Sequence, residues 1–248
     1  MLTSVRSLLA ASIIAGAAFA ATPALAEDES TSDISVSGNV ALVTDYRFRG
    51  FSFTDGKPAI QGGIDLGHSS GVYVGAWASS LEDSPTFGSM ELDLYGGWSG
   101  DVAPGLTLDV GMLYYMYPAK DSPSEGAGPS DYFEPYLSLS TALGPVTATL
   151  GVNYAWDQSS LGSDDNLYIH GELEAGIPNT PITLSGHLGY TDGVLTITSD
   201  GDAFDWSVGA SATVLGGLSV GVSYVGVEGP SIEDFSDDAV VGTLSYSF

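Results

Sequence analysis

The sequence predicts an all-β protein, a closed antiparallel transmembrane β-barrel of about 12 strands that covers residues 34–248. Three observations predict this fold. Apolar and polar side chains alternate with a period of two along most of the chain, the alternating segments are long, and the connections between them alternate between short and long. The second and third observations favour a membrane barrel over a soluble β-sandwich.

The alternation is clear in residues 146–157. Val146, Leu150 and Val152 fall on one face of an extended chain, whereas Thr149 falls on the other. A soluble sandwich would turn the apolar face inward, and a membrane barrel would turn it toward lipid. Alternation alone therefore leaves both arrangements open.

The predicted strands are long. Most span ~10–13 residues, close to the ~9–11 that a tilted strand needs to cross a bilayer and longer than the ~5–6 usual in soluble domains. Their number is even, as in single-chain bacterial barrels. We expect strands at 34–46, 58–68, 72–81, 89–99, 106–117, 131–142, 146–157, 166–177, 182–191, 204–214, 218–228 and 239–248.

The connections alternate in length, as short periplasmic turns and long external loops do in membrane barrels. A sandwich has no reason for this parity. The short connections are at 69–71, 100–105, 143–145, 178–180 and 215–217, and the longer ones are at 47–57, 82–88, 118–130, 158–165, 192–203 and 229–238.

Aromatic residues gather where the predicted strands meet the long connections. Outward-facing aromatics at this depth would form an interfacial girdle, and packing in the interior is the alternative. These residues are Tyr46, Phe48, Tyr114, Tyr115, Tyr117, Tyr132, Phe133, Tyr154, Trp156, Tyr190, Phe204, Trp206 and Tyr224, with Tyr73, Trp98, Tyr246 and Phe248 near the opposite rim.

Residues 1–26 predict a cleavable secretory signal peptide. Arg6 precedes a long apolar run, and Ala24-Leu25-Ala26 places small residues where a signal peptidase needs them. We expect residues 27–33 to be a flexible N-terminal segment. The apolar run is too short to favour a retained membrane anchor.

At the other end, Leu244, Tyr246 and Phe248 alternate on the predicted outward face. This pattern resembles the C-terminal strand by which outer-membrane proteins are presented to the barrel-assembly machinery. The chain has no cysteine, so disulfides cannot stabilise it. A closed strand network, which leaves no unpaired edge, is one solution.

The charge balance excludes one class of partner. The formal net charge is −26, and loss of Arg6 with the signal peptide would make it about −27. Nucleic acid is therefore not an expected partner, because phosphate binding requires positive charge. A chain that is acidic and yet 44% hydrophobic must place the two kinds of residue in different regions.

Three runs near the N-terminus carry a family resemblance. They are Asp45-Tyr46-Arg47-Phe48-Arg49-Gly50-Phe51-Ser52, Pro58-Ala59-Ile60-Gln61-Gly62-Gly63-Ile64-Asp65, and His68-Ser69-Ser70-Gly71-Val72-Tyr73-Val74-Gly75-Ala76-Trp77. Together they resemble the TorF family of porin-like proteobacterial proteins over roughly residues 39–98. The resemblance implies an outer-membrane location and a pore, and it implies no particular solute and no catalytic residue.

The strand parity predicts an acidic lumen wall that faces a small basic patch. Such a transverse field would favour cations and polar solutes at a constriction. The alternative is that Arg47 and Arg49 only pair with lumen acids and stabilise the interior. The predicted pore-lining residues are Arg47, Arg49, Asp65, Glu91, Asp93, Asp109, His170, Glu172 and Glu174.

Other functions are less favoured by the sequence. The acidic loops could bridge divalent cations weakly, although none has EF-hand spacing. A lipid-modifying enzyme would need a serine beside His170 or His187, and no Gly-x-Ser-x-Gly motif frames one. Two histidines with so few other ligands predict no zinc site. A non-conducting structural or surface-binding barrel remains an alternative, because twelve strands lie between filled and open barrels.

We therefore expect an outer-membrane, porin-like channel for passive diffusion of small polar solutes or ions, with a preference for cations. It would not be an enzyme and would need no cofactor. Its expected partners are outer-membrane lipid, the barrel-assembly machinery, and small solutes or cations.

Overall fold

The computed structural model describes residues 33–120 and 128–248. The predicted signal peptide at 1–26, and all but the last residue of the predicted segment 27–33, lie outside the described residues. Within the described part of the chain, no helix is long and apolar enough to cross a membrane.

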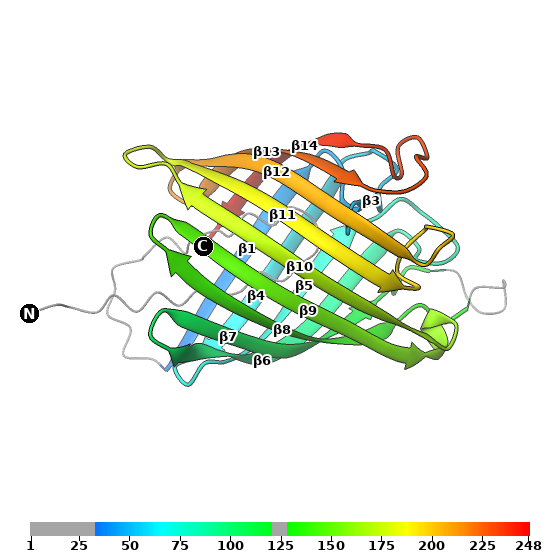
Figure 1. Cartoon of the computed structure of the whole chain (residues 1–248), viewed down its shortest axis with the longest axis horizontal. Helices are drawn as coiled ribbons and strands as arrows, with labels where there is room; N and C mark the ends of the chain where they lie inside the picture. Colours follow the sequence, from blue (N-terminus) through cyan, green and yellow to red (C-terminus); the bar gives the residue numbers. More distant parts are fainter. Residues whose placement is uncertain (1–32, 121–127) are drawn as a thin grey trace, which may run out of the picture.

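The described chain forms a closed antiparallel barrel in which neighbouring strands are joined by hairpins (Figure 1). The order around the barrel is β1-β14-β13-β12-β11-β10-β9-β8-β7-β6-β5-β4. The wall strands are β1 (Ile34–Val43), β4 (Ala59–His68), β5 (Val72–Ser80), β6 (Met90–Ala103), β7 (Leu106–Met116), β8 (Tyr132–Leu143), β9 (Val146–Gln158), β10 (Asp164–Gly176), β11 (Ile182–Gly193), β12 (Asp202–Leu215), β13 (Leu218–Val227) and β14 (Ala239–Ser247).

This architecture confirms the predicted fold class and its twelve wall strands. The barrel closes where β14 pairs with β1, with Asn39 opposite Ser247. Beyond that register, the backbone groups of Gly38 and Phe248 exchange two hydrogen bonds of 3.0 Å. Closure gives every wall strand two neighbours and so removes the unpaired edges of an open sheet.

The two faces of the wall differ as the alternation predicts. Leu150, Leu188 and Val208 are among many large apolar side chains that remain exposed on the outside. Glu134 and Asp205 are instead buried inside the barrel. Such an apolar outer surface around a polar interior is the arrangement of a transmembrane barrel.

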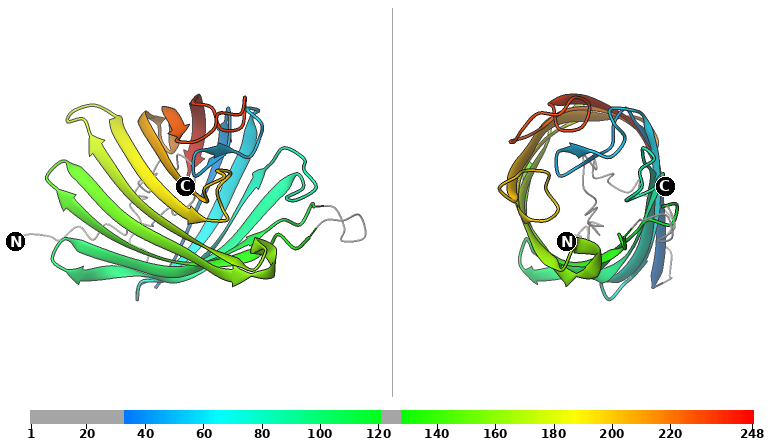
Figure 2. Two further views of the ribbon diagram at one scale, coloured as in Figure 1. Left: turned by 45° about the vertical axis from the view of Figure 1, so that its right-hand side comes forward. Right: turned by 90° about the vertical axis from the view of Figure 1, so that its right-hand side faces the viewer.

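The predicted first strand, 34–46, is too long. β1 ends at Val43, and the chain then turns inward through β2 (Arg47–Phe48) and β3 (Phe51–Ser52), which pair only with each other. Figure 2, right, places this hairpin inside the ring of wall strands. We call residues 44–58 the inserted segment. The predicted external loop at 47–57 therefore lies in the interior over residues 47–54, whereas residues 55–57 are exposed.

A tight turn makes this hairpin. Arg49 has φ 47° and Gly50 has φ 85°, so both central residues adopt the positive φ that a type I′ turn requires. A type I′ turn matches the twist of the two strands it joins. The Arg-Gly pair thus directs the chain back on itself after only two residues of β2.

The predicted aromatic girdle divides into two groups. Phe133, Tyr154, Trp156, Phe204 and Tyr224 are exposed on the outside, as a girdle requires. The prediction is wrong for a second group, whose aromatic side chains pack in the interior. Tyr46, Phe48, Tyr115, Tyr117 and Tyr132 are buried there, and the hydroxyl of Tyr73 hydrogen-bonds with Asp109 and Tyr136.

Candidate functional site

The inserted segment is organised around Asp45. Its carboxylate accepts hydrogen bonds from Ser52 Oγ at 2.5 Å and Thr54 Oγ1 at 3.0 Å, and it forms a close ion pair with Arg47. Because all four side chains are buried, these bonds replace the water that the charges would otherwise keep. The segment is therefore a folded unit in the lumen.

The loop between β13 and β14 anchors one side of the inserted segment. Arg47 Nη1 donates to the carbonyl of Asp237 at 2.8 Å, and the Ser52 amide donates to the carbonyl of Phe235 at 2.8 Å. The rings of Phe51 and Phe235 also stack, with centroids 6.1 Å apart. Arg47 thus acts as a structural link here, and its charge is matched by Asp45.

Arg49 anchors the tip of the hairpin to the far wall. Its Nη2 donates to Glu134 Oε1 of β8 at 2.7 Å, and its guanidinium lies 4.2 Å from the ring centroid of Tyr168 on β10. Tyr115 and Asn153 donate to the other carboxylate oxygen of Glu134. Counted from β1 around the barrel, β10 is the fifth strand in one direction and β8 is the fifth strand in the other, so both lie across the lumen from β1. The segment therefore crosses the lumen.

Glu91 and Asp93 face inward on β6, as predicted, but they do not line open water. Their exposed fractions are 0% and 1%. The Tyr46 hydroxyl approaches the Glu91 carboxylate, whereas the Asp93 carboxylate has no hydrogen-bond partner among the described residues. Tyr46 and Tyr117 interact electrostatically with both. These two acids therefore lie against the inserted segment.

Asp65 and Asp109 each face a tyrosine in the interior. Tyr95 Oη donates to Asp65 at 2.6 Å, and Tyr73 Oη donates to Asp109 at 2.6 Å. Each carboxylate thereby accepts a hydrogen bond from a neutral donor, and neither forms an ion pair with an arginine or lysine among the described residues. Both predicted residues therefore contribute to an acidic interior.

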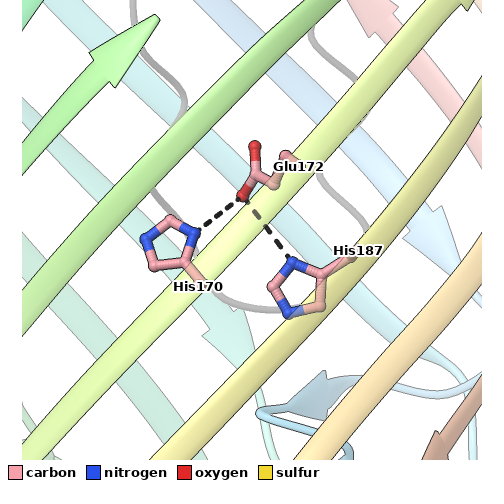
Figure 3. Close-up of side chains that lie close together, drawn as sticks. All are labelled: His170, Glu172 and His187. Atoms are coloured by element: carbon pink, nitrogen blue, oxygen red, sulfur yellow. Dashed lines mark ion pairs between the residues drawn. The ribbon is translucent and has the colours of Figure 1, made fainter.

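His170, Glu172 and His187 converge on the wall formed by β10 and β11 (Figure 3). Glu172 Oε1 lies 3.3 Å from His170 Nδ1 and 3.8 Å from His187 Nδ1. Glu172 is 47% exposed, so this cluster opens to the lumen. Glu174 follows two residues later on the same face of β10.

The sequence analysis missed three residues that complete these contacts. Glu134 holds Arg49, and Asp205 and Tyr168 hold His187 through contacts of 2.8 Å and 2.9 Å to its Nε2. The alternation places all three inward. The partner of Glu134 comes from the inserted segment, and Tyr168 and Asp205 meet His187 across neighbouring strands whose register the alternation does not give, so the sequence pattern alone gives no reason to select them.

The interior carries more negative than positive charge. Arg47 and Arg49 are the inward cations predicted from the sequence, and each pairs with a carboxylate of its own. The inward carboxylates of the wall strands are Asp65, Glu91, Asp93, Asp109, Glu134, Glu172, Glu174 and Asp205. An excess of fixed negative charge in a confined space concentrates cations there.

The structure gives no support to a serine-based catalytic site at the predicted histidines. Among residues 33–120 and 128–248, neither His170 nor His187 has a serine hydrogen-bond partner. His68 does contact Ser70, at 2.8 Å, in the exposed turn after β4. In the same described ranges, the acidic loop residues form no group of three ligand atoms close enough to hold one ion.

Comparison with known proteins places the chain among bacterial proteins with a porin fold. It is similar in structure to the NanC porin, with a TM-score of 0.57 and 11% identity over 86% of this chain and 99% of that chain. It is likewise similar to the KdgM porin in complex with disordered oligogalacturonate, with a TM-score of 0.59 and 10% identity over 86% and 99%. At these identities the likeness concerns the fold.

A search of curated protein sequences finds no match. The porin-like fold implied by the TorF resemblance is confirmed, whereas membership of TorF itself stays a prediction. The sequence profile of one family, described as "Bacterial protein of unknown function (Gcw_chp)", matches residues 27–248. The chain therefore belongs to the Gcw_chp family.

Proposed function

We propose that this protein is an outer-membrane channel for passive diffusion of small polar solutes and ions, and that it favours cations. The observation that carries the proposal is the charge of the interior. Both arginines of the inserted segment are neutralised by carboxylates, whereas Asp65 and Asp109 contact tyrosines and have no arginine or lysine partner among the described residues. The apolar outer face suits a bilayer.

The inserted segment would form the constriction of this channel. It crosses the lumen from β1 to the β8–β10 wall, so a solute must pass beside it. Glu172 and Glu174 lie on that wall, and Glu172 is 47% exposed to solvent. These two residues are the best candidates to set the charge of the pathway.

The test is single-channel recording in planar bilayers with a potassium chloride gradient. The reversal potential of the wild-type protein should have the sign of cation preference, and Glu172→Gln/Glu174→Gln should move it toward zero. Asp200→Asn, in an exposed loop, is the matched control and should leave it unchanged. Anion preference in the wild type would refute the proposal.

A non-conducting barrel is the second candidate function. The specific observation in its favour is the aromatic packing around the inserted segment, where Phe48 contacts Tyr115 and Phe53 and Tyr46 contacts Trp77. Bilayers that stay silent, although insertion is verified independently, would favour this candidate. The external loops would then be the place to search for a binding activity.

The remaining assignments follow from the same proposal. A passive channel needs no cofactor and performs no catalysis. Leu244, Tyr246 and Phe248 face outward on and beyond β14, where the barrel-assembly machinery and then lipid would meet them. Cleavage of residues 1–26 would precede this step.

A further inference from the structure

We propose that His170, Glu172 and His187 form a binding site for one divalent transition-metal ion, such as Zn²⁺ or Cu²⁺, on the lumen wall. One ligand atom from each residue lies within 4.8 Å of the others. This inference revises the expectation that the histidines have too few partners to hold a metal. It concerns binding alone, and it does not depend on whether the barrel conducts.

The spacing of the ligand atoms suits a small cation. In a tetrahedral zinc site, ligands at ~2.0–2.2 Å from the metal lie about 3.4 Å from each other. The two distances from Glu172 Oε1 to the imidazole Nδ1 atoms are 3.3 Å and 3.8 Å. Glu172 is half-exposed, and no pair of ligand atoms is more than 4.8 Å apart, so side-chain adjustments of about 1 Å would complete three protein ligands.

His170 supplies an independent reason to expect a ligand. Its side chain is only 7% exposed, and the polar contact of its Nδ1 within the described residues is the 3.3 Å approach to Glu172 Oε1, which is too poorly aligned for a good hydrogen bond. A Cβ on residue 151 would lie only 2.2 Å from the other ring nitrogen, Nε2, so the ring can take this position only because residue 151 is glycine. A buried nitrogen with so poor a hydrogen bond is costly, and a cation bound between His170 and Glu172 would satisfy it.

Asp205 fixes the orientation of the second imidazole. Its carboxylate lies 2.8 Å from His187 Nε2, so a proton on that nitrogen is donated to Asp205. The Nδ1 lone pair of the neutral ring then points toward Glu172. A carboxylate behind a metal-binding histidine is the usual outer partner at such sites. Tyr168 Oη, 3.2 Å from the same carboxylate oxygen, supports Asp205.

These contacts leave three electron-pair donors facing one another in the neutral-histidine state. Two imidazoles and one carboxylate suit Zn²⁺ and Cu²⁺ better than Ca²⁺ or Mg²⁺, which prefer oxygen ligands alone. The lumen is open at Glu172, and its acidic walls would raise the local concentration of cations. Water could occupy the remaining coordination position.

The test is a calorimetric titration of the refolded protein in detergent with ZnCl₂ alone. We expect one zinc ion per chain, and we expect His170→Ala, His187→Ala and Glu172→Gln each to abolish this site. Asp205→Asn should weaken binding by about 10–100-fold without removing a ligand. His68→Ala is the matched control, because His68 is the remaining histidine of the chain and lies exposed at the end of β4.

Refolding of each variant is checked by its heat-dependent gel mobility. If a histidine variant does not fold, Cu²⁺ electron paramagnetic resonance on the wild type decides the matter, because two imidazole ligands give resolved nitrogen couplings. Absence of these couplings, or equal zinc binding by the wild type and His170→Ala/His187→Ala, would overturn the proposal. Conductance enters neither experiment, so failure of the proposed channel would leave the result intact.

Discussion

The guanidinium of Arg49 and the carboxylate of Glu134 meet at 2.7 Å after approaching from nearly opposite sides of the barrel. The exposed fractions of the two side chains are 2% and 0%, so contacts within the protein replace their hydration. Arg49 and Glu134 contact each other, and Tyr115 and Asn153 donate hydrogen bonds to Glu134. It is the contact that fixes the tip of the inserted segment to the far wall.

Arg49→Ala should destabilise the protein by about 3–5 kcal/mol, because it leaves the buried charge of Glu134 without its partner. Urea unfolding in detergent micelles measures this change. The double variant Arg49→Ala/Glu134→Ala should recover part of the loss, since it removes both charges.

The matched control is the exposed ion pair between Lys57 and Glu82, which has the same 2.7 Å separation. Its hydrogen bond raises the pKa of Lys57 above the usual value, but both side chains are about half exposed. Lys57→Ala should therefore change stability little. Equal losses in Arg49→Ala and Lys57→Ala would show that the lumen pair has no special structural role.

Removal of the inserted segment should raise the single-channel conductance several-fold. Val43 and Ala59 are register partners on β1 and β4, so residues 44–58 can be replaced by an Asn-Gly turn without breaking the wall. Insertion of Gly-Ser after Gly144, in an exposed turn at the other rim, is the control and should leave conductance unchanged. Unchanged conductance in the shortened protein would mean that the segment is not the constriction.

Glu91→Gln and Asp93→Asn should maintain or increase stability, since each replaces a buried carboxylate that has no cationic partner among the described residues with a neutral side chain. Their effect on ion selectivity should be smaller than that of Glu172→Gln, which acts on an exposed carboxylate. Urea unfolding and reversal potentials measure the two properties. A loss of selectivity as large as that of Glu172→Gln would place Glu91 and Asp93 on the solute pathway.

Val208→Arg should cost about 2–4 kcal/mol if this outward side chain of β12 lies near the middle of the bilayer. Ser211→Arg, three residues further along the same strand but facing inward, should cost less because the lumen is polar. Unfolding from lipid vesicles compares the two variants. A smaller cost for Val208→Arg would contradict the assignment of the outer face to lipid.

Gly151→Ala should weaken zinc binding, because its Cβ would lie 2.2 Å from His170 Nε2 and would force the ring to move. Gly186→Ala is the control, since nothing lies within 4 Å of a Cβ built there. Calorimetry on both variants isolates the position of the ring from the loss of a ligand. If both bind zinc as the wild type does, the close approach of His170 to Gly151 does not set the site.

The sequence predicts the wall of the barrel well, since the alternating polarity within each wall strand shows which side chains face lipid and which face the lumen. Leu150 and Thr149 differ in polarity because one faces out and the other in, and this local relationship can be read without knowing any partner strand. The twelve strands and their faces follow from it. Strand ends differ by a few residues, as at β6, which continues to Ala103 rather than ending at residue 99.

The inserted segment could not be predicted in this way. Tyr46, Arg47, Phe48 and Arg49 continue the alternation of β1, so periodicity extends the strand through the point where the chain leaves the wall. The Arg49-Gly50 pair was the available signal for a tight turn. The place where the hairpin packs depends on Glu134 and Tyr168, which are contributed by strands far along the chain.

The seam between β1 and β14 has a consequence for biogenesis. Asn39 must find Ser247 across nearly the whole length of the polypeptide, and such distant pairing is slow because the connecting chain must first be ordered. Until the last hairpin docks, β1 exposes a strand edge that could recruit another chain. A chain truncated before Ala239 would therefore form an open sheet with two unpaired, aggregation-prone edge strands rather than a smaller closed barrel.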